Sequence, residues 1–275
     1  MLRTRLLTAA VALPAVLAAI LFLPGWAFTL FIVVLGLWGL YEVAGMTGRG
    51  SRPPLVECLV VGIAFGLYPF LTDDAKFSWV MPTAAALLML ALVVEVGRYG
   101  AEDAVARWNP YGLGQLNSKR LLAAIGALYT GLLFPYFALL RNSPRGIALV
   151  ILMLLLVICT DSSAYFTGRA IGRHKLAVRV SPGKTIEGGI AGIAASIVAG
   201  LILRGWLVPQ WSSAEMAGFA GVIAVLAVVG DLANSAFKRL AGVKDSGWIF
   251  PGHGGLLDRT CSLVLAAVLT YYYSG

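Results

Sequence analysis

Long apolar runs separated by short polar connections dominate the pattern of this chain. About 20 consecutive apolar residues span the hydrocarbon core of a bilayer as a helix. Nine runs approach this length, so the pattern predicts an all-α polytopic integral membrane protein with about nine transmembrane helices. The predicted spans are residues 6–23, 26–46, 55–71, 79–97, 121–140, 146–160, 189–208, 217–234 and 256–273.

The composition supports a membrane protein. Hydrophobic residues make up 59% of the chain and charged residues 12%, whereas an average soluble domain has about 25% charged residues. The net charge of +8 suits a face that meets anionic lipid or an anionic substrate. Because the basic residues stand in short loops between spans, we expect the lipid bilayer as a partner and no nucleic acid.

The basic residues also predict the orientation, since Lys and Arg concentrate in cytoplasmic loops. With the N-terminus in the cytoplasm, 17 of the 21 basic residues face inward, and nine spans place the C-terminus outside. The loop with Arg141 and Arg145 is an exception. The result is a cell (inner) membrane protein whose chemistry, carried by the C-terminal half, faces the cytoplasm.

The first 120 residues contain no chemical motif. We divide the chain into N-terminal spans with a cytoplasmic surface segment at 98–120 (residues 1–120) and a catalytic transmembrane region (residues 121–275). Glu42, Glu57 and Glu95 stand near predicted cytoplasmic helix ends. They could line a cavity, but the interpretation we favour places them at the interface, paired with nearby Arg.

The first stretch that predicts chemistry is the loop expected from Asp161 to Gly189. If the sixth span continues past Thr160, Asp161 and Tyr165 share one helix face. Ser181-Pro-Gly-Lys-Thr offers groups that suit a phosphate, although a basic loop with a Ser-Pro turn is the alternative. A P-loop is rejected, because its first glycine would fall at Val178. The candidate substrate contacts here are Asp161, Ser162, Tyr165, Arg169, Ser181, Lys184, Thr185 and Glu187.

Two further polar groups stand at the ends of the last two spans. Asp231, Asn234, Ser235 and Lys238 form one stripe on a helix. Pro251-Gly-His-Gly-Gly precedes a helix N-terminus, where free amides and the helix dipole favour an anion. The alternatives are an interfacial Asp231 paired with Lys238, and a flexible turn with a buried Asp–Arg pair.

Asp231 and Asp258 thus face a common cytoplasmic pocket from adjacent predicted helices. Mg²⁺ is commonly held by one or two carboxylates together with substrate phosphates, and basic side chains surround these two. The sequence therefore predicts one or two divalent cations, Mg²⁺ for preference, at Asp231 and Asp258. The chemistry that this combination favours is nucleotide-dependent phosphoryl or nucleotidyl transfer at a membrane surface.

The run from Ser235-Ala-Phe-Lys-Arg through Lys244-Asp-Ser-Gly-Trp to His253-Gly-Gly-Leu-Leu-Asp-Arg-Thr closely resembles the signature of the phosphatidate cytidylyltransferases. The block from Asp161-Ser-Ser-Ala-Tyr to Ser181-Pro-Gly-Lys-Thr-Ile-Glu-Gly is similar to an upstream block of the same family. One departure is Cys261, where that signature usually has a second Asp.

The resemblance implies the reaction CTP + phosphatidate → CDP-diacylglycerol + pyrophosphate, with metal at Asp231 and Asp258, in a homodimer. The nucleophile is an ionised phosphate, so no strong general base is required. His253 could donate to a phosphate or brace its loop. We expect catalytic roles for Asp231, Asp258, Lys238, Arg239, Arg259 and His253, and further substrate contacts from Ser235, Lys244, Asp245, Gly252, Gly254 and Gly255.

Two other functions stay open on the sequence. A related enzyme could transfer CMP to another lipid phosphate, or could be a CTP-dependent lipid kinase. A protein of another class, an ion-coupled transporter, could use Asp231 and Asp258 as cation sites. No inverted repeat or helix broken near mid-membrane supports the transporter.

Overall fold

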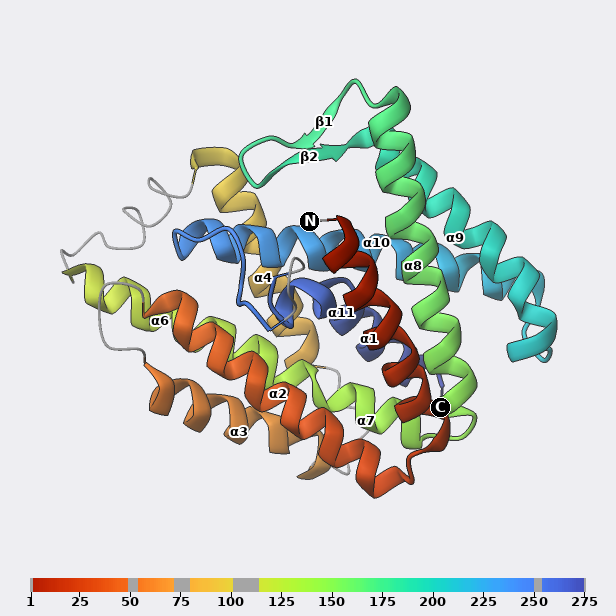
Figure 1. The fold of residues 1–275 in the computed structure, drawn as a ribbon, viewed down its shortest axis with the longest axis horizontal. Coiled ribbons are helices and arrows are strands. Elements are labelled where there is room, and N and C mark those ends of the chain that lie inside the picture. The colour runs from red at the N-terminus through yellow and green to blue at the C-terminus, as the bar shows by residue number, and fades with distance from the viewer. Residues whose placement is uncertain (1, 49–53, 72–79, 101–113, 250–253, 275) are drawn as a thin grey trace.

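The computed structural model describes residues 2–48, 54–71, 80–100, 114–249 and 254–274. Helices form almost all of this described part, and one short antiparallel hairpin interrupts them (Figure 1). The elements are α1 (Leu2–Phe22), α2 (Gly25–Thr47), α3 (Leu55–Leu71), α4 (Val80–Tyr99), α6 (Gly114–Leu133), α7 (Pro135–Asn142), α8 (Gly146–Ile171), β1 (Lys175–Ala177), β2 (Ser181–Thr185), α9 (Ile186–Leu207), α10 (Ser213–Leu240) and α11 (Leu257–Tyr273).

Within the described chain, six segments are long and apolar enough to cross a membrane. They are Gly25–Thr47, Pro82–Tyr99, Lys119–Asn142, Gly146–Ile171, Ile186–Leu207 and Ser213–Leu240. The protein is therefore a multi-pass membrane protein. Helices α3 and α11 have 17 residues each, the lower limit for a span of about 17–25 residues. The expected total of nine spans and their orientation stay predictions.

The predicted fifth span, residues 121–140, lies within the candidate span Lys119–Asn142, which the structure divides into two consecutive helices. Helix α6 ends at Leu133 and α7 begins at Pro135. A proline has no amide hydrogen to donate to the carbonyl four residues earlier, so the hydrogen-bond pattern is interrupted here, although Phe134 keeps a right-handed helical conformation. At the other end, α6 begins at Gly114, so the last part of the predicted surface segment belongs to this helix. Residues 101–113 of that segment lie outside the described residues.

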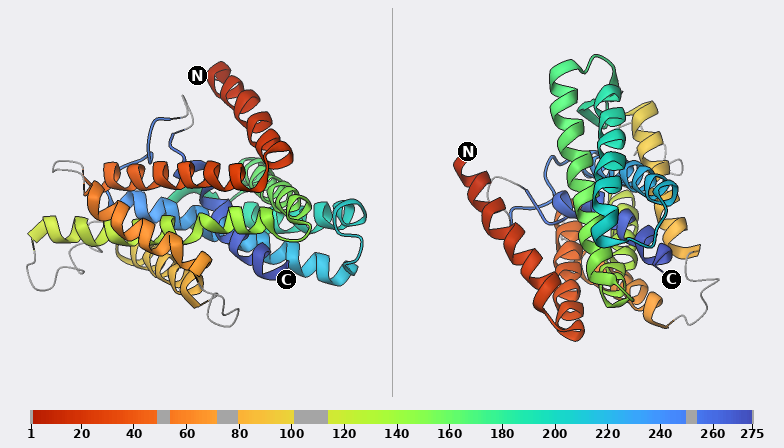
Figure 2. Two further views of the ribbon diagram at one scale, coloured as in Figure 1. Left: turned by 90° about the horizontal axis from the view of Figure 1, so that it is seen from below. Right: turned by 90° about the vertical axis from the view of Figure 1, so that its right-hand side faces the viewer.

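Helix α10 crosses the middle of the molecule and packs against α4, α8, α9 and α11 (Figures 1 and 2). Small residues permit this close packing, since Ala227, Ala233 and Ala236 are fully buried. A second layer is formed by α2, α3 and α6, which pack on one another. A Cβ on Gly131 of α6 would lie 2.2 Å from the carbonyl oxygen of Gly62 in α3. The two predicted regions of the chain thus share one packed structure.

Arg141, which breaks the positive-inside pattern, has a structural partner. Its guanidinium donates to the carbonyl oxygens of Ile20 and Leu23 at the end of α1, at 3.3 and 2.7 Å. It also lies over the ring of Phe28 at 5.7 Å. Carbonyls at a helix C-terminus lack partners within the helix and favour a cation. This contact explains a basic residue in a loop that is expected to face outward.

Candidate functional site

Helix α8 continues eleven residues beyond the predicted end of the sixth span, to Ile171. The first part of the predicted loop is therefore helical, which corrects the expected boundary. Asp161 and Tyr165 share a helix face, as the continued helix requires, and Arg169 donates to the Tyr165 hydroxyl at 3.1 Å. Asp161 accepts from the Ser262 hydroxyl of α11 at 3.3 Å. Ser162 is exposed beside it.

The run from Ser181 to Thr185, for which a Ser-Pro turn in a basic loop was the alternative interpretation, forms strand β2 and pairs with β1. The hairpin reaches back to α10, because Arg239 donates to the Val180 carbonyl oxygen at 3.4 Å. This contact brings Lys184 of β2 to Asp231 of α10, with Nζ and Oδ2 2.8 Å apart. Lys184 thus stands in a strand, whereas the lysine of a P-loop stands in a loop that wraps around phosphate. The chain segments 161–187 and 231–262 meet at this ion pair.

Thr185 and Glu187 have structural contacts that their sequence context did not indicate. The Thr185 hydroxyl accepts from the Gly188 amide at 3.1 Å and so caps α9. Added Cβ atoms on Gly168 of α8 and on Gly172, the residue that follows this helix, would each lie 2.7 Å from the Thr185 hydroxyl oxygen. Glu187 accepts from His174, which bonds through its amide at 3.1 Å and its ring Nδ1 at 2.6 Å. These contacts hold the hairpin on α8 and α9.

Asp258, in the first turn of α11, is almost enclosed by donors. Its Oδ1 lies 2.5 Å from the Lys238 ammonium and 3.2 Å from the Asn234 amide, both of α10. Its Oδ2 accepts from the Ser246 amide and hydroxyl at 2.8 and 3.0 Å, and from the Gly255 amide at 3.1 Å. The side chain is only 8% exposed. Lys238 therefore pairs with Asp258, not with Asp231 as the structural alternative proposed.

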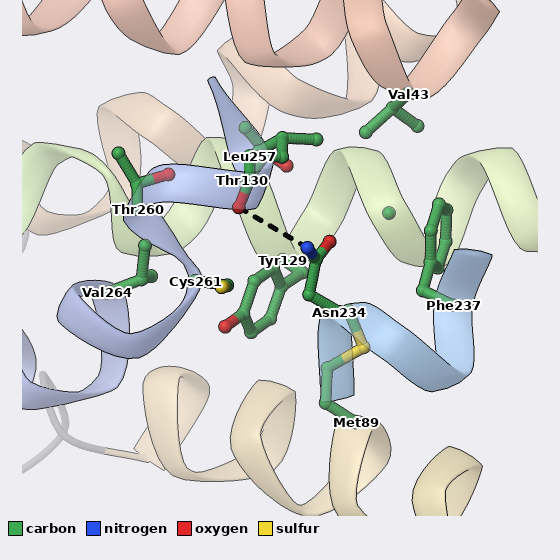
Figure 3. Close-up of a pocket in the computed structure, with 11 residues that line it drawn as sticks. Val43, Met89, Tyr129, Thr130, Asn234, Phe237, Leu257, Thr260, Cys261 and Val264 are labelled. Carbon is green, nitrogen blue, oxygen red and sulfur yellow. Dashed lines mark hydrogen bonds between the residues drawn. The ribbon is translucent and has the colours of Figure 1, made fainter. Parts of the chain in front are cut away.

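Cys261 lies between Asp231 and an apolar pocket at the centre of the molecule. Its thiol is 3.7 Å from Asp231 Oδ1 and 3.7 Å from the Asp258 carbonyl oxygen. Figure 3 shows the thiol beside Tyr129, with Asn234 bonded to the Leu257 carbonyl oxygen nearby. In the described part of the chain, the Tyr129 hydroxyl is buried without a hydrogen-bond partner. An Asp at 261 would place a charge at this boundary.

The two predicted metal ligands differ in how well they fit Mg²⁺. The Asp231 side chain is 40% exposed and contacts one ammonium and one thiol, so its hard oxygens can turn to a cation. Asp258 is saturated by protein donors and would have to leave Lys238 first. No cluster of three or more His, Cys, Asp or Glu suited to a metal occurs in the described ranges. Mg²⁺ needs only one or two carboxylates when phosphates supply the other oxygens.

The remaining predicted residues differ in burial. Ser235 and Ser181 are half-buried, while Arg259, Lys244 and Asp245 are exposed. Gly254 has a φ of +79°, a conformation that glycine adopts at no steric cost, and a Cβ on it would lie 2.6 Å from Asp258 Oδ2. Gly252 and His253 lie outside the described residues, and their roles stay predictions.

Glu42 and Ser246 are the residues that sequence reasoning missed. Glu42 was expected at the interface, paired with Arg, and that interpretation is wrong: its side chain is buried and accepts from the Ser246 hydroxyl at 3.0 Å. The available signal was its isolation, since it is the single charged residue of α2. An ionisable residue within a span is a candidate functional group by default.

Comparison with known proteins assigns this arrangement to a class. The profile of the Cytidylyltransferase family matches residues 3–275, and the chain belongs to this family. It is similar to a phosphatidate cytidylyltransferase of Pseudomonas aeruginosa, with 37% identity over 97% of this chain and 94% of that protein. It is also similar to a phosphatidate cytidylyltransferase of Brucella abortus, with 34% identity over 99% of this chain and 93% of that protein. A phosphatidate cytidylyltransferase of Bacillus subtilis shares 32% identity over 94% of this chain and 95% of its own.

Proposed function

We propose that this protein transfers CMP from CTP to phosphatidate, which yields CDP-diacylglycerol and pyrophosphate for phospholipid biosynthesis. One observation carries the proposal: in a chain that matches the Cytidylyltransferase family over residues 3–275, two carboxylate–lysine pairs stand on α10, one joining it to β2 and the other joining it to α11. The relatives at 31–37% identity over nearly the full chain support phosphatidate as the acceptor.

The reaction forms one phosphorus–oxygen bond and breaks another. A phosphate oxygen of phosphatidate attacks the α-phosphorus of CTP, and the bond from that phosphorus to the bridging oxygen of the β-phosphate breaks. Both reactants are polyanions, so the site must reduce their repulsion and hold them in line. Lys184 and Lys238 suit this task, because each now neutralises one carboxylate and can turn to a phosphate when one arrives.

Exposed basic residues extend the charge around these lysines. Arg169 stands on α8 and Arg259 on the first turn of α11, both exposed. The Gly255 amide, which now donates to Asp258, stands just before α11, where the helix dipole favours an anion such as phosphate. Asp231, and Asp258 once it is released from Lys238, would hold Mg²⁺. When bound, this cation supplies charge neutralisation for the triphosphate and the departing pyrophosphate.

The setting of the site follows from its substrates. CTP is a cytoplasmic nucleotide and phosphatidate a membrane lipid, so the site opens to the cytoplasm for one and toward the bilayer for the other. The proposed setting is the cell membrane, with nine spans, the N-terminus inside and the C-terminus outside. A homodimer is part of the proposal, on the resemblance to the family.

The test is conversion of phosphatidate by the purified protein in detergent, with CTP and Mg²⁺. Pyrophosphate release and analysis of the lipid product measure the turnover. We expect turnover that is lost with chelator and in Asp231→Asn, while circular dichroism shows unchanged helix content. The control is Lys175→Met, a change at an exposed lysine of β1 outside both ion pairs and outside the expected substrate contacts. Turnover by Cys261→Asp but not by the wild-type protein would mean a diverged site. Failure of both would refute the proposal and direct the assay to other lipid phosphates and then to ion transport.

A further inference from the structure

A carboxylate from the N-terminal half of the chain stands against the loop that carries Asp258. Glu42 of α2 is 4% exposed. Its Oε1 accepts from the Leu256 amide at 2.7 Å and from the Trp38 indole at 3.2 Å. Its Oε2 accepts from the Leu257 amide and from the Ser246 hydroxyl, each at 3.0 Å. Three of these four donors belong to the segment between α10 and α11 or to the beginning of α11.

Glu42 replaces the cap that α11 does not have in its own sequence. The N-cap residue of α11 is Leu256, and its side chain makes no capping hydrogen bond. The first amides of a helix have no partner inside it and attract negative charge. Glu42 meets this need from 214 residues away in the sequence. Because Asp258 follows Leu257 directly, the contact of Glu42 with the Leu257 amide also fixes the position of Asp258 in the first turn of α11.

The Ser246 side chain joins the two carboxylates. Its hydroxyl lies 3.0 Å from Glu42 Oε2 and 3.0 Å from Asp258 Oδ2, and its amide donates to Asp258 at 2.8 Å. A hydroxyl has one proton to donate, so at any moment it donates to only one of the two carboxylates between which it lies. A displacement of Glu42 would therefore move a group that Asp258 uses directly.

The position of the Glu42 carboxylate explains why two residues near Ser246 and Leu256 are glycines. A Cβ on Gly247 would lie 2.6 Å from Glu42 Oε1, and a Cβ on Gly255 would lie 2.4 Å from Oε2. The carboxylate is the end of a long side chain, but it could move only by breaking its hydrogen bonds. Both positions thus need glycine because a residue of α2 occupies the space.

We infer that Glu42 is a positioning residue of the nucleotidyl-transfer site, an inference that rests on the proposed function. Glu42 holds the loop with Ser246 and the N-terminus of α11, and thereby fixes Asp258 and its pairing with Lys238. It touches no reacting atom. A misplacement of about 1 Å at a reacting centre can cost about 100-fold in rate, which is the scale expected when this support is weakened.

The test is Glu42→Gln, which keeps the shape but presents amide hydrogens to donors. The matched control is Glu57→Gln, the same change at an exposed glutamate of α3. We expect kcat to fall about 10- to 100-fold with KM for CTP nearly unchanged, because the substrate contacts remain. Hydrogen exchange should accelerate in peptides of residues 244–260 and stay as in the wild-type protein in α8 and α9.

Wild-type kcat, or wild-type exchange at residues 244–260, would overturn the inference. If Glu42→Gln does not fold, Gly247→Ala takes its place, since its methyl group should displace the Glu42 carboxylate and produce the same two signatures; their absence would be equally decisive. The exchange experiment needs no turnover. If the wild-type protein is inactive, the proposed function fails, and the exchange at residues 244–260 alone decides whether Glu42 holds the loop.

Discussion

Substitution of Lys238 should measure how much the Lys238–Asp258 ion pair contributes to the stability of the protein. Lys238→Met keeps the length of the side chain but leaves the Asp258 carboxylate without a cation, and that side chain is 8% exposed. Removal of one partner from a buried pair costs about 3–5 kcal/mol. Asp258 would keep neutral donors from Asn234, Ser246 and Gly255. We therefore expect Lys238→Met to lower the free energy of unfolding by about 3 kcal/mol, the lower end of this range.

A double-mutant cycle separates this cost from general damage. In Asp258→Asn the buried charge is absent, so the further change Lys238→Met should cost far less than it does in the wild-type protein. The expected coupling free energy is about 2 kcal/mol, within the range of close charge pairs. The matched control is Lys244→Met, an exposed lysine four residues beyond the end of α10, which should stay within about 0.5 kcal/mol.

The assay is equilibrium unfolding by added SDS in mixed micelles, followed by helical circular dichroism for the wild-type protein, both single variants, the double variant and the control. It measures the free energy of unfolding and does not depend on turnover. Additive losses, within about 0.5 kcal/mol, would refute the reasoning, because they would mean that Lys238 does not compensate the Asp258 charge. An equal loss in the control would also refute it.

Three further predictions concern contacts that hold the helices in place. Thr185→Ala should destabilise the protein by about 1 kcal/mol through loss of the α9 cap, and Thr185→Ser should restore most of it in the same SDS titration. Gly131→Ala should lower the unfolding midpoint more than Gly97→Ala, because the Gly131 methyl would meet the Gly62 backbone whereas that of Gly97 meets open space. Arg141→Gln should accelerate proteolysis near the end of α1 while kcat stays unchanged, because the guanidinium bonds only to Ile20 and Leu23 among its described hydrogen-bond partners; unchanged proteolysis would contradict this.

Much of the local structure could be predicted because its causes are local. Apolar runs of span length become helices in a bilayer, where backbone groups must bond within their own segment. The prediction of the spans 189–208 and 217–234 was therefore close to α9 and α10. The boundary at Thr160 was wrong because hydropathy changes at Asp161, whereas helical hydrogen bonding continues to Ile171. Hydropathy describes the environment of a segment and does not determine where its helix ends.

The candidate site divides in the same way. The sequence by itself determined the membrane class, the helical segments and the residue types suited to phosphate and metal, because these depend on composition and short spacings. Only the tertiary structure decided the partners: Lys184 with Asp231, Lys238 with Asp258, and Glu42 with the amides of α11. These pairs join residues 20 to 214 positions apart. Which charges meet depends on how helices pack, and no local pattern contains that information.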